Sequence, residues 1–186
     1  MHWTPPTIET ARLVLRAVTE ADADAVFAAC SNPAVTRFTL FDTHRTVTDS
    51  LRFVWDYALA NYLEMIPDPF AITVKGDAGS PVVGCVGCHW ASRPNRTLEL
   101  GYWLAEPYWG KGLVAEGAAA AVAFCFANYP AERIQARVVA GNAASVRVLE
   151  KIGFAYEGTM RKCLSRRGVQ EDVMVFARLR GDPDPG

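Results

Sequence analysis

One stretch of the chain limits the possible folds more than any other, because it joins a strand, a glycine loop and a long apolar helix. The strand is expected over Thr97–Leu104 and the helix over about Leu113–Tyr129, with Gly110-Lys111-Gly112 between them. Such a loop can bring several backbone N–H groups together, and the helix N-terminus adds partial positive charge. Phosphate is the natural ligand of this arrangement. The same residues also suit a plain tight turn.

The nucleotide and hydrolase signatures of several other folds are missing from the sequence. It contains no Gly-x-x-x-x-Gly-Lys-Ser/Thr and no Gly-x-Ser-x-Gly, which argues against a P-loop NTPase and an α/β-hydrolase. No Gly-x-Gly-x-x-Gly follows the first strand, which disfavours a Rossmann domain. The three histidines, His2, His44 and His89, lack metal-ligand spacing, so we expect no metal site.

The pair Cys85 and Cys88 resembles a metal or redox motif but falls inside a predicted strand, Val82–Trp90. Residues three apart on a strand face opposite sides, so the two sulfurs should diverge. No second Cys/His pair follows at zinc-finger spacing. We therefore expect buried structural thiols.

Charge and hydropathy narrow the range of partners and locations. The net charge is −1, so no overall basic field favours nucleic acid or an anionic membrane as a partner. The longest uncharged apolar run, residues 117–127, is too short to cross a bilayer. Residues 1–6 show no secretory signal, and the five cysteines are an odd number. Both features favour a cytoplasmic protein with reduced thiols.

Hydrophobic spacing and turn residues predict a mixed α/β domain. The expected strands are Arg12–Arg16, Phe70–Val74, Val82–Trp90, Thr97–Leu104, Ile134–Val139, Phe154–Met160 and Val173–Leu179. The expected helices are about Thr19–Cys30, Leu51 to just before Pro67, Leu113–Tyr129 and Asn142–Ile152. In the second helix, the inward stripe would be Leu51, Val54, Trp55, Ala58 and Tyr62. A basic loop should join the last two strands. We expect one domain over residues 1–180 and a disordered tail over residues 181–186.

The segment from Gly141 to Phe154 is the second candidate for chemistry. Asn142 would cap the helix, Leu149 would face inward with Val146, and Gly153 would end it. This structural explanation accounts for most of the segment when it is considered alone.

Together, the two segments resemble the GCN5-related N-acetyltransferase (GNAT) superfamily, and within it the ribosomal-protein alanine N-acetyltransferase branch. The resemblance includes the opening Thr10–Arg16 and the later Phe154–Gly158, and it spans about residues 7–179. It implies a single-domain, mostly antiparallel sheet whose two central strands, Thr97–Leu104 and Ile134–Val139, splay apart between flanking helices.

The resemblance also implies a binding site for acetyl-coenzyme A. The pantetheine arm would enter the gap between the splayed strands and pair with the backbone of Tyr102, Trp103 and Leu104. The pyrophosphate would lie on the N–H groups of the loop Trp109, Gly110, Lys111, Gly112, Leu113 and Val114. Family members favour Gln/Arg-x-x-Gly-x-Gly/Ala there, so Gly112 matches while Trp109 and Val114 depart from the pattern.

Aminolysis of a thioester assigns roles to three polar side chains in these segments. A protonated amine cannot attack, so a base must take its proton. Glu99 lies in mid-strand, matches an acidic position in the family, and is the candidate base, directly or through water. Ser145 is the candidate donor to the departing thiolate, and Asn142 would position the cofactor or a water. A backbone N–H near Leu104 would stabilise the oxyanion.

The resemblance suggests a protein N-terminal α-amine as the acceptor, such as that of a ribosomal protein. Small amines, including aminoglycosides and polyamines, are alternatives, and so is a non-catalytic domain that binds coenzyme A. The helices of residues 20–66 would shape the acceptor pocket. The oligomeric state is open, with a homodimer among the alternatives, and so is the choice of acyl chain.

Overall fold

The computed structural model describes residues 3–183, and within them eight strands form one sheet in the order β1-β2-β3-β4-β5-β6-β8-β7. All neighbouring strands are antiparallel except β5 and β6, which are parallel. The strands are β1 (Ile8–Glu9), β2 (Leu13–Ala17), β3 (Phe70–Val74), β4 (Gly84–Ser92), β5 (Thr97–Leu104), β6 (Arg133–Val139), β7 (Ala155–Arg166) and β8 (Val169–Leu179). The predicted mixed, mostly antiparallel sheet is therefore confirmed.

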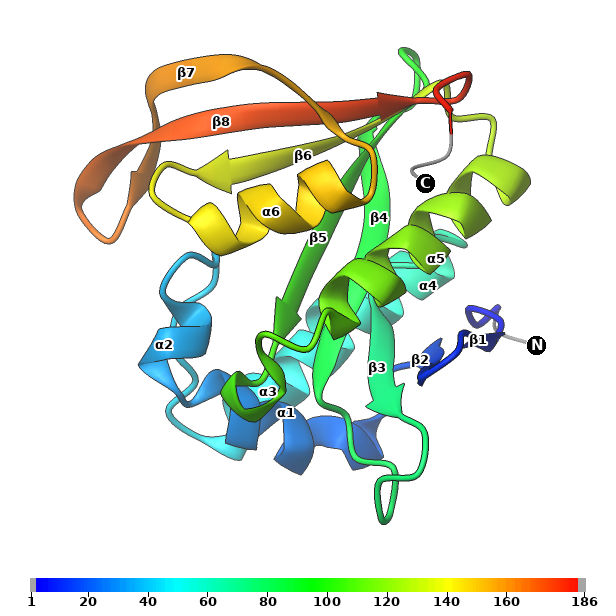
Figure 1. Ribbon diagram of the computed structural model, residues 1–186. Coiled ribbons are helices and arrows are strands. Elements are labelled where there is room, and N and C mark those ends of the chain that lie inside the picture. Colours follow the sequence, from blue (N-terminus) through cyan, green and yellow to red (C-terminus); the bar gives the residue numbers. More distant parts are fainter. Residues whose placement is uncertain (1–2, 184–186) are drawn as a thin grey trace.

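Helices cover both faces of this sheet (Figure 1). Two long helices, α5 (Leu113–Asn128) and α6 (Ala143–Lys151), lie on one side, which we call the α5/α6 face. The other side, the α1/α4 face, carries η1 (Glu20–Asp22), α1 (Ala23–Cys30), α2 (Pro33–Thr36), α3 (Val47–Arg52), η2 (Phe53–Leu59) and α4 (Ala60–Leu63). A short turn, η3 (Glu106–Tyr108), precedes α5. The elements β1, α2 and η3 are additions to the predicted order.

Each face has its own apolar core, and strand β4 contributes side chains to both cores. Cys88 packs with the α5/α6 core, whereas Cys85 packs with the α1/α4 core. Both thiols are free and buried, as the alternation of side chains along a strand requires. The prediction of two diverging structural cysteines is confirmed.

The parallel pair β5 and β6 separates after a short ladder, which creates the gap on which the site depends. The pairing runs from Thr97↔Arg133 to Glu99↔Gln135 and then stops. Beyond it, β5 continues to Leu104 and β6 to Val139, and the two strands diverge in Figure 1. The splayed central pair predicted from the family resemblance is confirmed.

The second predicted helix begins earlier, ends earlier and is wound differently from what its spacing suggests. Helices α3, η2 and α4 follow one another from Val47 to Leu63, and η2 is π-helical. Val54, Ala58 and Tyr62 are buried, but Trp55 is 44% exposed and donates its indole N–H to Glu20. The inward placement of Trp55 is wrong, because the wider π turn carries it away from the α-helical stripe.

The predicted basic loop between the last two strands is also wrong, because the strands continue through it. Only Arg167 and Gly168 separate β7 from β8, with φ of 50° and 78°. This two-residue turn with left-handed residues suits a tight hairpin. Cross-strand charge pairs such as Arg166–Glu171, at 2.7 Å, hold the outer part. These strand ends lack apolar alternation, so the sequence pattern did not reveal them.

At the C-terminal end, Asp182 accepts the Leu179 N–H through its carboxylate at 2.8 Å. Residues 184–186 of the predicted tail lie outside the described residues. Within residues 3–183, no helix is long and apolar enough to cross a membrane. The same part of the chain holds no cluster of three or more His, Cys, Asp or Glu that could bind a metal ion.

Candidate functional site

The loop before α5 presents a row of backbone N–H groups without acceptors. Its backbone bonds end with Trp109 N–H to Glu106 C=O and resume with Glu116 N–H to Gly112 C=O. Within residues 3–183, the backbone N–H groups of residues 110–115 donate no hydrogen bond. Gly112 caps the helix with φ of 72°, a conformation that favours glycine. These groups and the helix N-terminus together favour an anion.

Two cations stand beside Gly112, which strengthens this anion preference. A Cβ placed on Gly112 would lie 3.7 Å from Arg12 Nη2 and 3.8 Å from Lys151 Nζ. Arg12 is already fixed, because its Nε donates to Glu116 at 2.6 Å and its Nη1 to the Lys111 carbonyl at 2.9 Å. The approach to Gly112 is therefore both open and positively charged.

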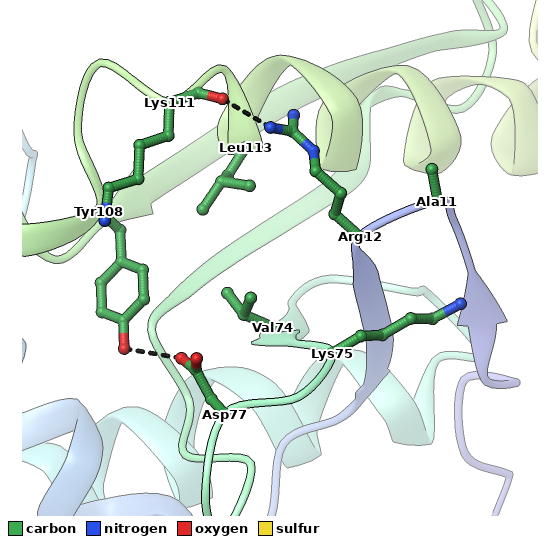
Figure 2. A pocket seen from close by; sticks show the side chains of 8 residues that line it. All are labelled: Ala11, Arg12, Val74, Lys75, Asp77, Tyr108, Lys111 and Leu113. Atoms are coloured by element: carbon green, nitrogen blue, oxygen red, sulfur yellow. Dashed lines mark hydrogen bonds between the residues drawn. The ribbon is translucent and has the colours of Figure 1, made fainter.

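The outer side of the same loop is braced around a cavity of about 400 Å³ (Figure 2). Tyr108 donates its hydroxyl to Asp77 at 2.9 Å, and Lys111 Nζ lies 5.2 Å from the centre of the Tyr108 ring. Figure 2 shows Arg12, the residue before β2, reaching the Lys111 carbonyl. These contacts hold the loop from behind, so its N–H groups keep a fixed geometry.

The end of β5 offers free backbone groups to the gap at alternate residues. The Ala105 N–H bonds to Val83 next to β4 at 2.8 Å. Because backbone groups alternate direction along a strand, Trp103 also faces β4, whereas Tyr102 and Leu104 face the gap. The Leu104 carbonyl accepts the Trp109 indole N–H at 2.7 Å. Of the three predicted backbone partners, Tyr102 and Leu104 are directed into the gap and Trp103 is not.

On the α5/α6 face, the gap is bordered by two hydroxyl groups in contact. Tyr102 Oη lies 2.7 Å from Ser145 Oγ, and burial raises the pKa of Tyr102 to about 12, although the hydrogen bond to Ser145 opposes that rise. Asn142 Oδ1 accepts the Ser145 N–H at 3.2 Å, which confirms Asn142 as the cap of α6. The structure thus brings Asn142, Ser145 and Tyr102 together.

On the α1/α4 face, Glu99 lies where the gap begins, and its carboxylate is already engaged. Arg137 Nε donates to its two oxygens at 2.8 and 3.0 Å, and Gln135 Nε2 donates at 2.9 Å. Glu99 is buried, whereas the Arg137 side chain is 47% exposed. Three bonds occupy most of the acceptor positions of a carboxylate, so Glu99 is poorly placed to take a proton from an incoming amine.

A histidine–carboxylate pair, His89 and Asp68, lies beside Glu99. His89 is the cross-strand partner of Glu99, and its Nδ1 lies 2.9 Å from Asp68 Oδ2. Tyr57 donates its hydroxyl to the same Asp68 oxygen at 2.5 Å. The hydrogen bond with Asp68 raises the pKa of His89, although burial opposes the rise. His89 borders a pocket of about 260 Å³ next to α4.

Two facing glycines leave the sheet bare between these groups. Gly87 and Gly101 are cross-strand partners on the face that carries His89 and Glu99. A Cβ on Gly87 would overlap the Asp68 side chain, whereas one on Gly101 would meet nothing within 4 Å. Asp68 therefore fills the space over Gly87, and the space over Gly101 stays open.

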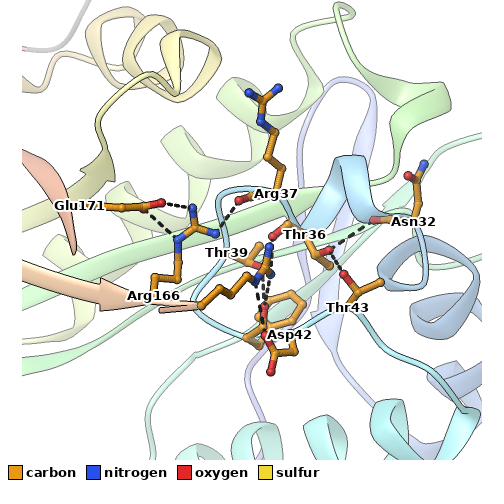
Figure 3. A network of polar contacts seen from close by, with 10 residues as sticks. Asn32, Thr36, Arg37, Thr39, Asp42, Thr43, Arg166 and Glu171 are labelled. Atoms are coloured by element: carbon orange, nitrogen blue, oxygen red, sulfur yellow. Dashed lines mark hydrogen bonds and ion pairs between the residues drawn. The ribbon is translucent and has the colours of Figure 1, made fainter. Parts of the chain in front are cut away.

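The tip of the β7–β8 hairpin contacts the loop after α2 on this same side (Figure 3). Arg166 Nη1 donates to the Arg37 carbonyl at 2.6 Å, and Arg167 Nη2 donates to the carbonyls of Thr36 and Phe41 at 2.9 and 3.2 Å. Two segments far apart in the sequence are thereby joined, and the loop is held in place.

Asp68, His89 and Arg137 were not predicted as site residues. The spacing of the histidines had been weighed only for metal binding. The turn at residues 93–96 could have placed His89 opposite Glu99, but the pairing shifts by one residue between Trp90 and Ser92. Asp68 precedes β3, outside any motif, so no local pattern signals its contact with His89.

Comparison with known proteins agrees with this geometry. Residues 12–155 match the family model described as acetyltransferase (GNAT) domain. The protein named "Uncharacterized N-acetyltransferase YoaA", from Bacillus subtilis (strain 168), is 31% identical over 175 residues, covering 94% of this chain and 97% of that protein.

Solved structures share the fold along nearly the whole chain. An acetyltransferase of the GNAT family from Bacillus anthracis superposes with a TM-score of 0.84 and 26% identity, covering 95% of this chain and 100% of that one. RimL, a ribosomal L7/L12 α-N-protein acetyltransferase in complex with coenzyme A, superposes with a TM-score of 0.82. At 20% identity, with 94% and 98% of the two chains covered, that second likeness concerns the fold.

Proposed function

This chain belongs to the GNAT acetyltransferase family and is an acyltransferase, and we propose that it moves an acetyl group from acetyl-CoA to a primary α-amine. The observation that carries the proposal is the gap between β5 and β6, which begins at Glu99 and opens beside the row of free N–H groups before α5. One substrate can lie along the gap while its phosphates reach the loop.

Acetyl-CoA fits the α5/α6 face of the gap. Its pyrophosphate would accept bonds from the N–H groups of residues 110–115, close to Arg12 and Lys151. Charge-assisted bonds of this kind are about twice as strong as neutral ones. The pantetheine amides would pair with Tyr102 and Leu104, and Trp109, Leu113 and Val114 would shape the loop around them.

The chemistry is direct attack of the amine nitrogen on the thioester carbonyl carbon. The oxyanion that forms would accept a bond from a free backbone N–H at the end of β5. As the C–S bond breaks, Ser145 would donate to the thiolate, and Tyr102 Oη, 2.7 Å from Ser145 Oγ, would support that hydroxyl. Asn142 would keep the start of α6 in place.

In this proposal Glu99 fixes Arg137 at the edge of the gap. Only Nε of Arg137 bonds to Glu99, and across residues 3–183 no hydrogen bond involves its Nη1 or Nη2. A guanidinium with free donors suits a carbonyl or carboxylate. Every peptide N-terminus carries a carbonyl one carbon away from its α-amine, so Arg137 favours an α-amine over an isolated alkyl amine.

An α-N-protein acetyltransferase among the structural neighbours agrees with this acceptor class. Aminoglycosides and polyamines are the competing acceptors, since they offer amines without an adjacent carbonyl. We also propose a cytoplasmic location, where the five cysteines, all free, would stay reduced.

A screen of acceptors with acetyl-CoA tests the proposal. Peptides with a free N-terminus, the same peptides with a blocked N-terminus, spermidine and an aminoglycoside would be compared by release of free thiol. Mass spectrometry would then locate the acetyl group. We expect turnover with free peptides only, and acetylation at the α-amine. Turnover with spermidine or the aminoglycoside alone would reject the α-amine, and release with none of them would reject transfer to amines.

A further inference from the structure

We propose that His89, held by Asp68, is the group that accepts the proton of the attacking amine. This inference rests on the proposed acetyl transfer and deepens it. It assigns the proton to a side chain that no local motif identifies, and it leaves Glu99 with the task of holding Arg137.

The contacts of His89 fix both its orientation and its free nitrogen. Nδ1 lies 2.9 Å from Asp68 Oδ2, and the Asp68 side chain is only 5% exposed. A buried carboxylate at one nitrogen keeps the proton on that nitrogen and leaves Nε2 with a lone pair. Within residues 3–183, no hydrogen bond involves His89 Nε2, and the side chain is 38% exposed.

The surroundings of Asp68 are built to hold this pair. Tyr57 donates to Asp68 from the π-helical segment η2, and π segments often occur at functional sites. Gly87 leaves room on β4 for the Asp68 carboxylate, because any Cβ there would overlap it. A helix and a strand thus both support one carboxylate.

The pair lies next to the place where the two substrates would meet. His89 is directly opposite Glu99, the last residue of β5 that pairs with β6. His89 and Gly101 lie on the same face of two neighbouring strands, and such strands are about 5 Å apart. The space over Gly101 is open, which allows an amine to approach there.

The proton inventory of the step balances. A neutral amine forms the C–N bond, and the proton released from its nitrogen passes to His89 Nε2. The C–S bond breaks, and the thiolate receives a proton through the Ser145 and Tyr102 hydroxyls. His89 then returns its proton to water, and the hydroxyl pair regains one from water. The products are the acetylated amine and free coenzyme A.

The pH dependence follows from the charges around His89. Asp68 and Glu99 raise its pKa above the usual 6.5, with the Asp68 hydrogen bond as the largest cause, whereas burial and Arg137 lower it. Tyr57 from η2, Glu64 at the C-cap of α4 and Arg93 from the turn after β4 also border its pocket. Only neutral imidazole accepts a proton, so kcat/KM should rise with pH through a pKa above about 6.5.

Kinetics with acetyl-CoA and a free N-terminal peptide provide the first test. His89→Gln should lower kcat/KM about 100-fold near neutral pH and remove the rise that follows His89, leaving the rise that follows the peptide α-amine near its pKa of about 8. Thermal stabilisation by coenzyme A should not change. Glu64→Gln, an exposed position in the same pocket, is the matched control and should keep the wild-type profile. A His89→Gln enzyme with wild-type rate and profile would overturn the proposal.

Nuclear magnetic resonance of the histidine rings provides a test without turnover. In the wild type, His89 should titrate above about 6.5 with its proton on Nδ1. Asp68→Asn should lower that pKa and lower kcat/KM at least tenfold. A ring that carries its proton on Nε2 would reject the base even if His89→Gln fails to fold. Absence of turnover with every amine would reject the proposed function instead, and the ring titration would still show whether the pair exists.

Discussion

The two faces of the gap present different kinds of chemical group, backbone on one and side chains on the other. On the α5/α6 face, the groups that would contact acetyl-CoA are mostly backbone N–H groups of one continuous loop and strand. On the α1/α4 face, the groups that surround the open space are side chains from distant elements, namely Asp68, His89, Glu99 and Arg137. One face is encoded locally, and the other exists only in the folded chain.

This difference determines what each face can tolerate. A backbone site depends on conformation, so glycines and their φ angles matter most there. A side-chain site depends on chemical identity, so conservative replacements that keep shape should still change rate or pH dependence. Substitutions on the two faces should therefore separate cofactor binding from transfer.

The largest effect is expected from Gly112→Asp on the α5/α6 face. A carboxylate beside the free N–H groups would repel the pyrophosphate and cost at least two charge-assisted bonds, or about 1000-fold in kcat/KM for acetyl-CoA. At a hundredfold excess over Kd, coenzyme A should stabilise the wild type by about 2.7 kcal/mol, and thermal unfolding should show that the variant loses this stabilisation.

The matched control is Gly79→Asp, because Gly79 has φ of 73° against 72° for Gly112 and lies in a surface turn. Both variants carry the same backbone strain, but only Gly112→Asp should lose the response to coenzyme A. An equal loss in both would mean that strain, and not an anion site, explains the result.

Gly101→Leu should produce the next largest effect, on the opposite face. Its side chain would enter the open space over β5 and displace the amine, and a misplacement of about 1 Å can cost about 100-fold in rate. Binding of coenzyme A, measured by calorimetry, should remain close to wild type. Loss of coenzyme A affinity together with rate would show that the two faces are not separable.

Glu99→Gln should have a smaller effect that is constant at high pH, and it should move the rising limb to lower pH, because Glu99 helps to raise the pKa of His89. The variant weakens the bond to Arg137, and a hydrogen bond to a charged group contributes about 1.5–3 kcal/mol, so kcat/KM should fall about 30-fold. Initial rates with a peptide acceptor across about pH 6–9 would measure it. If Glu99 were the base, the deficit would shrink as pH approaches the α-amine pKa of about 8.

Ser145→Ala should have the smallest effect, a fall of about tenfold in kcat, which is less than the roughly 100-fold or more typical of a general acid. Tyr102 Oη lies 2.7 Å from Ser145 Oγ and can supply part of the lost hydrogen bond. KM for acetyl-CoA should stay constant in steady-state assays. Adding Tyr102→Phe should deepen the fall, and a double variant no slower than the single one would exclude the hydroxyl pair.

Most of the fold could be predicted from the sequence because its elements carry local signals. The strand Thr97–Leu104 and the Asn142 cap of α6 were identified by alternation and by capping chemistry. The loop around Gly112 was identified by its two glycines between a strand and an apolar helix. Errors arose where packing or charge replaced those signals, as at Trp55 in the π-helical segment and in the charged ends of β7 and β8.

The residues of the candidate site also divide into those with a local sequence signal and those without one. Gly112, Tyr102 and Ser145 could be located from the sequence, since each belongs to a continuous motif. The partners of Glu99 could not, because Arg137 is 38 residues away and reaches Glu99 only once β6 has paired with β5. The same holds for Asp68, which meets His89 across 21 residues.

A titration of the protein with acetyl-CoA, followed through its backbone amides by nuclear magnetic resonance, tests the central claim most directly. We expect the amides of Tyr102, Leu104 and residues 110–115 to shift first and furthest, with the amides around Asp68 moving only when a peptide acceptor is added. Shifts that cluster away from the β5–β6 gap, or no shifts at all, would contradict acetyl transfer at this site.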